Sequence, residues 1–338
     1  MVFTLSSRNP DHDLVRRDAV VIGLVNNMPD AALRTTEQQF CGLLSAAARG
    51  RAISLRFFYL ADLPRGPEAR EYLRRRYAEI GGQWEGRLDG LIVTGAEPRT
   101  AALSDESYWP ALAKLVEWAD DHTISSVWSC LAAHAAVLHA DGIERRRMRG
   151  KLFGLFDCKK SADDPLLAGV PSRWKVPHSR YHDLPVEALA NKGYCVLSRS
   201  EAAGADMFAK RRSSLFVFLQ GHPEYDGGAL PREYRRDVRR FLSGQLEAYP
   251  EMPGGYFDDL TAAALDALKA RVLHDCDAGV LRDFPIVTAQ EKTACGWRQL
   301  AVQFYSNWLS YLMEHKHLAR GPQVSGGSAS PPRLPAAH

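Results

Sequence analysis

Short apolar runs alternate with helix-like segments along the first part of the chain. The runs are brief, rich in β-branched residues and followed by polar or glycine-containing loops, which is typical of buried strands. They cover Ala19–Val25, Ile53–Leu60, Leu88–Thr94 and Ile124–Ser129. Helices are predicted between and after them at Thr35–Ala48, Pro67–Ile80, Tyr108–Asp120 and Leu131–His139. The alternation predicts an α/β fold, a mostly parallel sheet flanked by helices.

The second half of the chain has a stronger β pattern before it becomes helical. Strands are predicted at Tyr194–Ser198, around Met207–Ala209 and at Leu215–Gln220. Helices are predicted at Arg232–Leu246, Asp258–His274 and Trp297–Met313. We therefore expect a flexible N-terminus over 1–17, a single domain over 18–317 with an inserted helical segment near 250–292, and a disordered Gly/Ser/Pro-rich tail over 318–338.

Composition and charge indicate which partners and which cellular location to expect. The chain has a formal net charge of +3 and a pI of about 8.5, which is too weak a basic balance to indicate nucleic acid. The N-terminus lacks a signal-peptide core, and no stretch approaches the length of a membrane span. We expect a cytoplasmic protein with no membrane partner. Six cysteines are scattered without a CxxC pair, so most should be free and buried.

Cys130, His222 and Glu224 are the residues with the clearest chemical pattern. Cys130 follows a predicted strand and precedes a helix, while His222 and Glu224 flank a proline just after another strand. A thiol at such a turn, with a histidine base oriented by a carboxylate, is the arrangement of a nucleophilic acyl-transfer enzyme. Taken singly, a cysteine at a strand end, such as Cys130, is more often simply a buried thiol, and the His-Pro-Glu turn could equally be a surface turn.

Glu233 and Arg236 lie three residues apart on the helix that follows this turn. They share a helical face and could bind the amine and carboxylate of an amino acid, or form a surface ion pair. Ser179, in Pro177–Tyr181, could belong to a substrate loop or to a structural turn. Lys151 follows a basic run and could simply be solvated. His178 and His182 lack further ligands, so we expect no metal site.

Together these motifs resemble the homoserine O-succinyltransferase/O-acetyltransferase family, which has a class I glutamine amidotransferase-like, flavodoxin-like fold. The matching segments are Gly90–Ala96, Tyr108–Pro110, the Cys130 turn, Pro177–Tyr181, Gly221–Asp226 and Asn307–Leu309. They occur in the family's order over residues 18–315.

The resemblance implies a catalytic triad of Cys130, His222 and Glu224. Cys130 would take the acyl group of succinyl-CoA or acetyl-CoA as a thioester and pass it to the hydroxyl of homoserine, by ping-pong kinetics in methionine biosynthesis. Lys151, Ser179, Glu233 and Arg236 match residues around the substrate. Backbone N–H groups near Gly95 and Leu131 would form the oxyanion hole. No bound cofactor is implied, the partners are small molecules, and a homodimer is plausible by analogy.

Several departures from the family pattern suggest a divergent branch. The lysines usual after the Met28-Pro29 pair are missing, and Arg34 is the candidate substitute. The position that separates acyl donors in the family is Arg99, where glycine or glutamate is usual. His134 replaces a glutamine one turn after Cys130.

Three other functions stay open at this point. The acceptor could be serine or another amino acid. The chain could be a glutamine amidotransferase-like hydrolase, although Ser129–Ala132 lacks the flanking glycines of that class. A non-catalytic binding protein is the third possibility.

Overall fold

A computed structural model describes residues 3–6, 19–80, 86–275, 278–284 and 291–320. The described strands are β1 Phe3–Ser6, β2 Val20–Val25, β3 Ile53–Tyr59, β4 Ala78–Glu79, β5 Gly90–Val93, β6 Ser125–Ser129, β7 Arg146–Lys160, β8 Arg173–Asp183, β9 Cys195–Ser200, β10 Gly204–Arg211 and β11 Leu215–Leu219. The α-helices are α1 Asp30–Ala48, α2 Pro67–Arg76, α3 Trp109–His122, α4 Leu131–Asp141, α5 Val186–Asn191, α6 Ala229–Leu242, α7 Asp259–Asp275 and α8 Glu291–Arg320. Short 3-10 turns are η1 Leu103–Asp105, η2 Pro165–Leu167 and η3 Ala278–Asp283.

The described strands form one mixed sheet of order β1-β3-β2-β5-β6-β11-β10-β9-β7-β8, with β4 beside β3. Pairing is parallel from β1 through β11 and antiparallel from β11 to β8. The predicted α/β class is confirmed. Residues 7–17 and 321–338 lie outside the described residues. Residues 318–320, the start of the predicted disordered tail, instead belong to helix α8, and β1 falls within the segment expected to be flexible.

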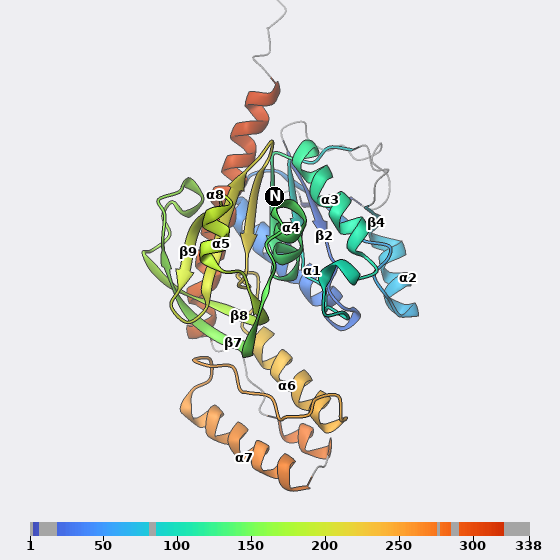
Figure 1. Cartoon of the computed structure of the whole chain (residues 1–338), viewed down its shortest axis with the longest axis vertical. Coiled ribbons are helices and arrows are strands. Elements are labelled where there is room, and N and C mark those ends of the chain that lie inside the picture. Colours follow the sequence, from blue (N-terminus) through green and yellow to red (C-terminus); the bar gives the residue numbers. More distant parts are fainter. Residues whose placement is uncertain (1–2, 7–18, 81–85, 276–277, 285–290, 321–338) are drawn as a thin grey trace, which may run out of the picture.

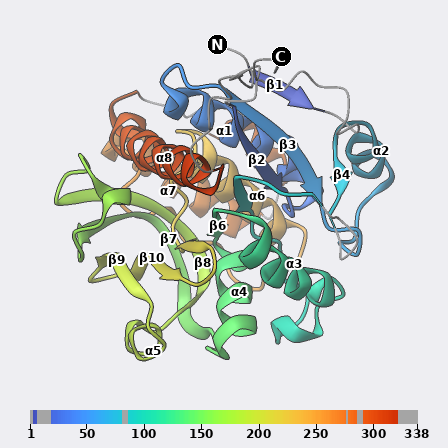
Figure 2. The ribbon, with the colours of Figure 1, turned by 90° about the horizontal axis from the view of Figure 1, so that it is seen from above.

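Two helical layers cover the sheet. Figure 2 shows α1 and α8 on one face and α3 and α4 on the other, and each side has its own buried apolar cluster. On the α8 side, the indole N–H of Trp308 donates to Ser125 Oγ at 2.9 Å. A Cβ on Gly90 would lie 2.7 Å from the Trp308 ring, so glycine permits this close approach. Helix α8 is therefore part of the core.

The antiparallel pair β7–β8 corrects one expectation. The Pro177–Tyr181 segment, expected to be a loop or turn, lies within strand β8. Pro177 is tolerated there because β8 is the edge strand of the sheet. The first half of β7 is mostly exposed, with no apolar alternation for sequence to reveal.

The helical insertion packs as a third cluster at one end of the body (Figure 1). Leu265 and Leu268 of α7, Tyr234 of α6 and Trp297 of α8 are buried together there. An isolated parallel bridge joins Gly154 of β7 to Gly254, with Gly254 N–H donating to Phe153 O at 3.0 Å. The insertion is thus attached to the sheet directly as well as through its own ends.

Two expectations on composition can be compared with the structure. Cys41, Cys130, Cys158 and Cys195 are all free, as expected, but only Cys158 of these four is buried. Within the described part of the chain, no helix combines the length and apolarity needed to cross a bilayer.

Gly154→Ala should lower the free energy of unfolding by about 2–3 kcal/mol. Gly154 has φ +139°, a conformation that side chains rarely adopt, and a Cβ there would overlap the Gly254 backbone. Urea denaturation would measure the loss. Gly150→Ala on the same strand is the matched control, because nothing lies within 4 Å of its Cβ position. Equal stability of the two variants would contradict the close approach.

Candidate active site

Cys130 occupies a sharp turn between β6 and α4. Its backbone is at φ 52° and ψ −115°, outside the usual regions for a residue with a side chain. Its N–H donates to Leu219 O of the neighbouring strand at 2.7 Å. The half-buried thiol therefore stands at the N-terminus of a helix, where the helix dipole favours a negative charge. Backbone strain of this kind clusters at functional sites.

The structure brings Cys130, His222 and Glu224 together. His222 Nδ1 lies 2.8 Å from Glu224 Oε1, both side chains are buried, and the imidazole also hydrogen-bonds the Cys130 thiol. Burial alone would lower the pKa of His222, but the charges of Glu224 and Cys130 outweigh it and hold that pKa well above its ordinary value. The arrangement therefore favours a protonated imidazole beside the Cys130 sulfur.

Neighbouring groups fix the position of the His222 loop. The His222 backbone N–H donates to Pro177 O of β8 at 2.8 Å. Its ring stacks on Tyr225, with centroids 4.3 Å apart and planes inclined by 16°. Arg298 of α8 donates to Glu224 O at 3.3 Å. The imidazole therefore has little freedom to turn away from Cys130.

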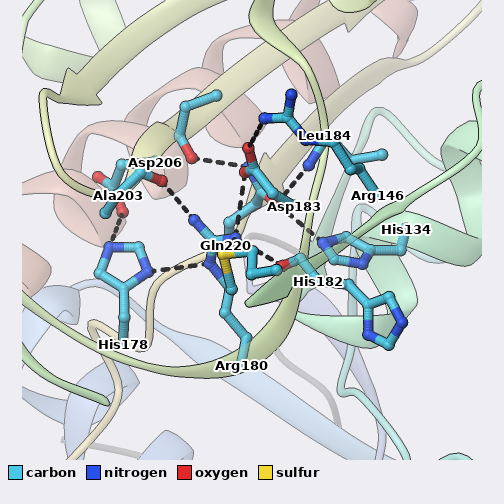
Figure 3. A network of polar contacts seen from close by, with 12 residues as sticks. His134, Arg146, His178, Arg180, His182, Asp183, Leu184, Ala203, Asp206 and Gln220 are labelled. Atoms are coloured by element: carbon cyan, nitrogen blue, oxygen red, sulfur yellow. Dashed lines mark hydrogen bonds and ion pairs between the residues drawn. The ribbon is translucent and has the colours of Figure 1, made fainter. Parts of the chain in front are cut away.

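A buried polar network centred on Gln220 includes His134 and Asp183 (Figure 3). Gln220 Oε1 accepts from Leu184 N at 3.2 Å and contacts His134 Nε2 at 2.8 Å. Because this oxygen can only accept, His134 Nε2 must carry the proton. Burial lowers the pKa of His134 to about 3, which keeps the ring neutral.

The histidine that replaces the family's glutamine is therefore part of the structural support. His134 belongs to the first turn after Cys130, and its backbone N–H donates to Cys130 O at 3.3 Å. Gln220 Nε2 donates to Ala205 O at 2.7 Å, which ties the network to β10. Gln220 was not predicted as a site residue, although its place two residues before His222 could have indicated it.

Gly95 and Leu131 meet beside the thiol. A Cβ built on Gly95 would lie 3.1 Å from Leu131 N, a tight contact that glycine avoids. Both residues follow the carboxyl ends of adjacent parallel strands, β5 and β6. Two backbone N–H groups in this position could bind an oxyanion at a carbonyl attacked by Cys130.

Lys151, Ser179, Glu233 and Arg236 also converge, from β7, β8 and α6. Ser179 Oγ donates to Glu233 Oε2 at 2.5 Å, and Arg236 lies 3.5 Å from the same oxygen. Lys151 Nζ is 3.7 Å from that oxygen. Burial alone would raise the pKa of Glu233, but Lys151 and Arg236 hold it below its usual value. Glu233 is therefore ionised within a compact polar cluster.

Asp237 and Tyr225 complete this cluster and were not predicted. Asp237 accepts from Lys151 at 2.7 Å and lies 2.9 Å from Arg236. The Tyr225 hydroxyl donates to Glu233, so the ring that stacks on His222 also reaches the cluster. Asp237 lies four residues after Glu233 on the same helical face, a spacing that could have revealed it.

Arg34 and Arg99, the two arginines singled out where the chain departs from the family pattern, are both exposed. Arg34 is exposed, pairs with Glu68 at 3.3 Å and stacks on Tyr72. The buried Arg65 contacts the loop instead, donating to Met28 O and lying 3.2 Å from Asp30 Oδ1. The Arg99 side chain is exposed, and its backbone N–H donates to Glu106 at 2.5 Å.

Three buried side chains could together bind a metal ion, although no metal site was expected from the sequence. Cys158, His178 and Asp206 are buried with potential ligand atoms within 4.8 Å of one another, the one such group among the described residues. Arg180 Nε donates to His178 Nδ1 at 3.4 Å, which assigns the ring proton to Nε2, the nitrogen that faces Asp206. A metal-bound histidine instead donates from its second nitrogen, so this geometry disfavours a metal.

Glu224→Gln should shift the titration of His222 to lower pH. The substitution removes the carboxylate charge that raises the pKa of His222, so the imidazolium would lose its proton earlier as pH rises. Alkylation of Cys130 by iodoacetamide should therefore slow at pH 7, by about tenfold if one charge-assisted bond is lost. The exposed Glu201→Gln is the control. An unchanged pH profile in Glu224→Gln would contradict the triad electrostatics.

Comparison with known proteins identifies a family. The family model described as homoserine O-succinyltransferase matches residues 1–318. The chain is 47% identical over 302 residues to a Rhodopseudomonas palustris protein named homoserine O-succinyltransferase, covering 89% of this chain and 90% of that protein. It is 45% identical to a Bradyrhizobium japonicum protein of the same name, covering 87% and 90%.

Solved structures show more distant likenesses. A glutamine amidotransferase from Methylobacillus Flagellatus is 16% identical, with a TM-score of 0.48 over 87% of this chain and 95% of that one. A glutamine amidotransferase from Thermotoga maritima is 15% identical, with a TM-score of 0.45 over 87% and 98%. On the evidence of the family model and of relatives that match along most of its length, this chain belongs to the homoserine O-succinyltransferase family.

Proposed function

We propose that this protein is a homoserine O-acyltransferase that transfers the succinyl group of succinyl-CoA through a thioester on Cys130. Family membership supports the acyl transfer, and the relatives' printed names support homoserine and succinyl groups. The observation that carries the mechanism is the hydrogen-bonded chain from Cys130 through His222 to Glu224.

In the first half-reaction, the Cys130 thiolate attacks the thioester carbonyl of the donor. The tetrahedral oxyanion is placed to accept hydrogen bonds from the backbone N–H groups of Gly95 and Leu131. Collapse of the intermediate breaks the bond between the carbonyl carbon and the CoA sulfur. The imidazolium of His222 then gives its proton to the departing CoA thiolate, leaving an acyl-Cys130 thioester and a neutral histidine.

In the second half-reaction, the neutral His222 accepts the proton of the homoserine hydroxyl as its oxygen attacks the acyl-Cys130 carbonyl. The bond to the Cys130 sulfur breaks, and the products are an O-acyl ester and the original thiolate–imidazolium pair. No external oxidant, reductant or metal is needed for this balance. Glu224 orients His222 and stabilises its charge in both steps.

The polar cluster of β7, β8 and α6 is suited to the backbone of an amino acid. Two cations, Lys151 and Arg236, balance two carboxylates, Glu233 and Asp237. A zwitterionic ligand brings one further charge of each sign, so it can bind without leaving a buried charge unpaired. We assign the ligand carboxylate to Arg236 and the ammonium to Glu233, beside Ser179.

Cys130→Ser should lose the acyl adduct that the wild-type protein forms with succinyl-CoA when no acceptor is present. Serine has a less acidic hydroxyl, which the same histidine does not ionise as readily. Intact-protein mass spectrometry measures the adduct. Cys195→Ser is the matched control because Cys195 is a free, exposed cysteine. An adduct that persists in Cys130→Ser, or one that disappears in Cys195→Ser, would reject Cys130 as the acyl carrier.

Arg236→Ala should raise the KM for homoserine by about 10- to 100-fold, the value of a charge-assisted hydrogen bond. The rate of acyl-enzyme formation from succinyl-CoA should stay near that of the wild type, because homoserine is absent from this step. Steady-state kinetics measure the KM for homoserine, and single-turnover CoA release measures the rate of acyl-enzyme formation. Arg239→Ala, an exposed arginine on the same helix, is the control. Equal damage to both half-reactions in Arg236→Ala would exclude the proposed contact.

A further inference from the structure

Arg145 is a cation next to the nucleophile that the proposed mechanism does not use. It precedes β7 and is half-buried, and it lies close enough to Cys130 for their charges to interact. Its Nη2 donates to Ala101 O at 3.1 Å. Ala101 belongs to the same loop as Arg99, the residue from which donor selectivity was expected. Arg145 therefore contacts this loop, and its charge interacts with that of the thiol.

The Arg145 guanidinium has no carboxylate partner among the described residues. One of its hydrogen bonds is the contact with Ala101 O, and no described ion pair includes it. Burial lowers its pKa, an effect that the nearby Tyr108, Glu106 and Cys130 only partly offset. A half-buried guanidinium that forms no described ion pair retains the capacity for a bidentate contact with a carboxylate.

The Tyr108 hydroxyl provides an independent observation at the same place. Tyr108 is 3% exposed, and its hydroxyl has no hydrogen-bond partner among the described residues. Buried hydroxyls are normally satisfied, so an unpaired one in this position is costly without a ligand. Tyr108 and Arg145 are also close enough for their charges to interact. Together they offer several donors to one anion.

A succinyl group on Cys130 carries such an anion at short range. Its carboxylate lies three carbon–carbon bonds, each about 1.5 Å long, beyond the thioester carbonyl. An acetyl group has no charge to place there. The charge of Arg145 interacts with that of Cys130. The Arg99 side chain, by contrast, is exposed, and its backbone N–H donates to Glu106 at 2.5 Å.

We propose that Arg145, assisted by the Tyr108 hydroxyl, binds the distal carboxylate of the succinyl donor and so selects succinyl-CoA. This assignment rests on the proposed acyl transfer through Cys130. Glu106 organises the wall of the same subsite, because its carboxylate accepts from the backbone N–H groups of Arg99 and Thr100 at 2.5 and 2.8 Å. Those bonds use Glu106 Oε1 and hold the loop whose Ala101 carbonyl contacts Arg145.

The test compares succinyl-CoA with butyryl-CoA, which has the same chain length but no carboxylate. Arg145→Met should lower kcat/KM for succinyl-CoA by about 10- to 100-fold and leave the value for butyryl-CoA within about threefold. Tyr108→Phe should give a smaller loss with the same selectivity. Arg147→Met, an exposed arginine two residues away, is the control and should change neither donor.

Four outcomes would overturn this role of Arg145. Equal losses with both donors in Arg145→Met would indicate a general effect on the thiolate. No loss in Arg145→Met, or a succinyl-selective loss in Arg99→Met instead, would remove Arg145 as the selector. A wild-type protein that uses acetyl-CoA or butyryl-CoA as well as succinyl-CoA would show that no selector exists, while acyl transfer itself would stand. A wild-type protein that forms no adduct with any of these donors would overturn both proposals. Circular dichroism confirms folding, and Tyr108→Phe keeps the test valid if Arg145→Met does not fold.

Discussion

The parallel register between β6 and β11 is the constraint on which the candidate site depends. Ser129 pairs with Leu219, so the two chains leave the sheet side by side, one into Cys130 and the other toward His222. The hydrogen bond from Cys130 N to Leu219 O fixes that relation at the backbone. A register shift of one residue would turn each side chain to the opposite face of its strand. The relative position of Cys130 and the His222 loop is therefore determined by the main chain of β6 and β11.

The antiparallel strands β7 and β8 supply further residues of the candidate site. Strands β7 and β8 bring Lys151 and Ser179 to Glu233 of α6, and Pro177 of β8 accepts from the His222 backbone. The polar cluster and the His222 loop are thus held by one strand pair. The inserted helices pack on the far side of α6, through Tyr234, so that their apolar surface supports the cluster.

Much of this organisation can be predicted from sequence, because local patterns encode it. The apolar runs marked the parallel strands, and strand ends marked Gly95, Cys130 and His222. The β7–β8 pair escaped prediction because its polar, exposed stretch has no alternation and its partners are distant in sequence. Arg99 and Arg145 show the same limit: whether an arginine is exposed or half-buried depends on tertiary packing, to which residue type gives no clue.

The bridge between Gly154 and Gly254 affects the conformational entropy that is lost when the chain folds. The segment between α6 and α8 is long, and closing a long loop costs conformational entropy that grows with the logarithm of its length. The bridge to Gly154 fixes Gly254 on the sheet. The folded protein therefore closes two shorter loops, one on each side of Gly254, in place of one long loop between α6 and α8. A lengthened insertion can thus be accommodated without loosening the ends of α6 and α8, because the additional chain is divided at a fixed point on the sheet.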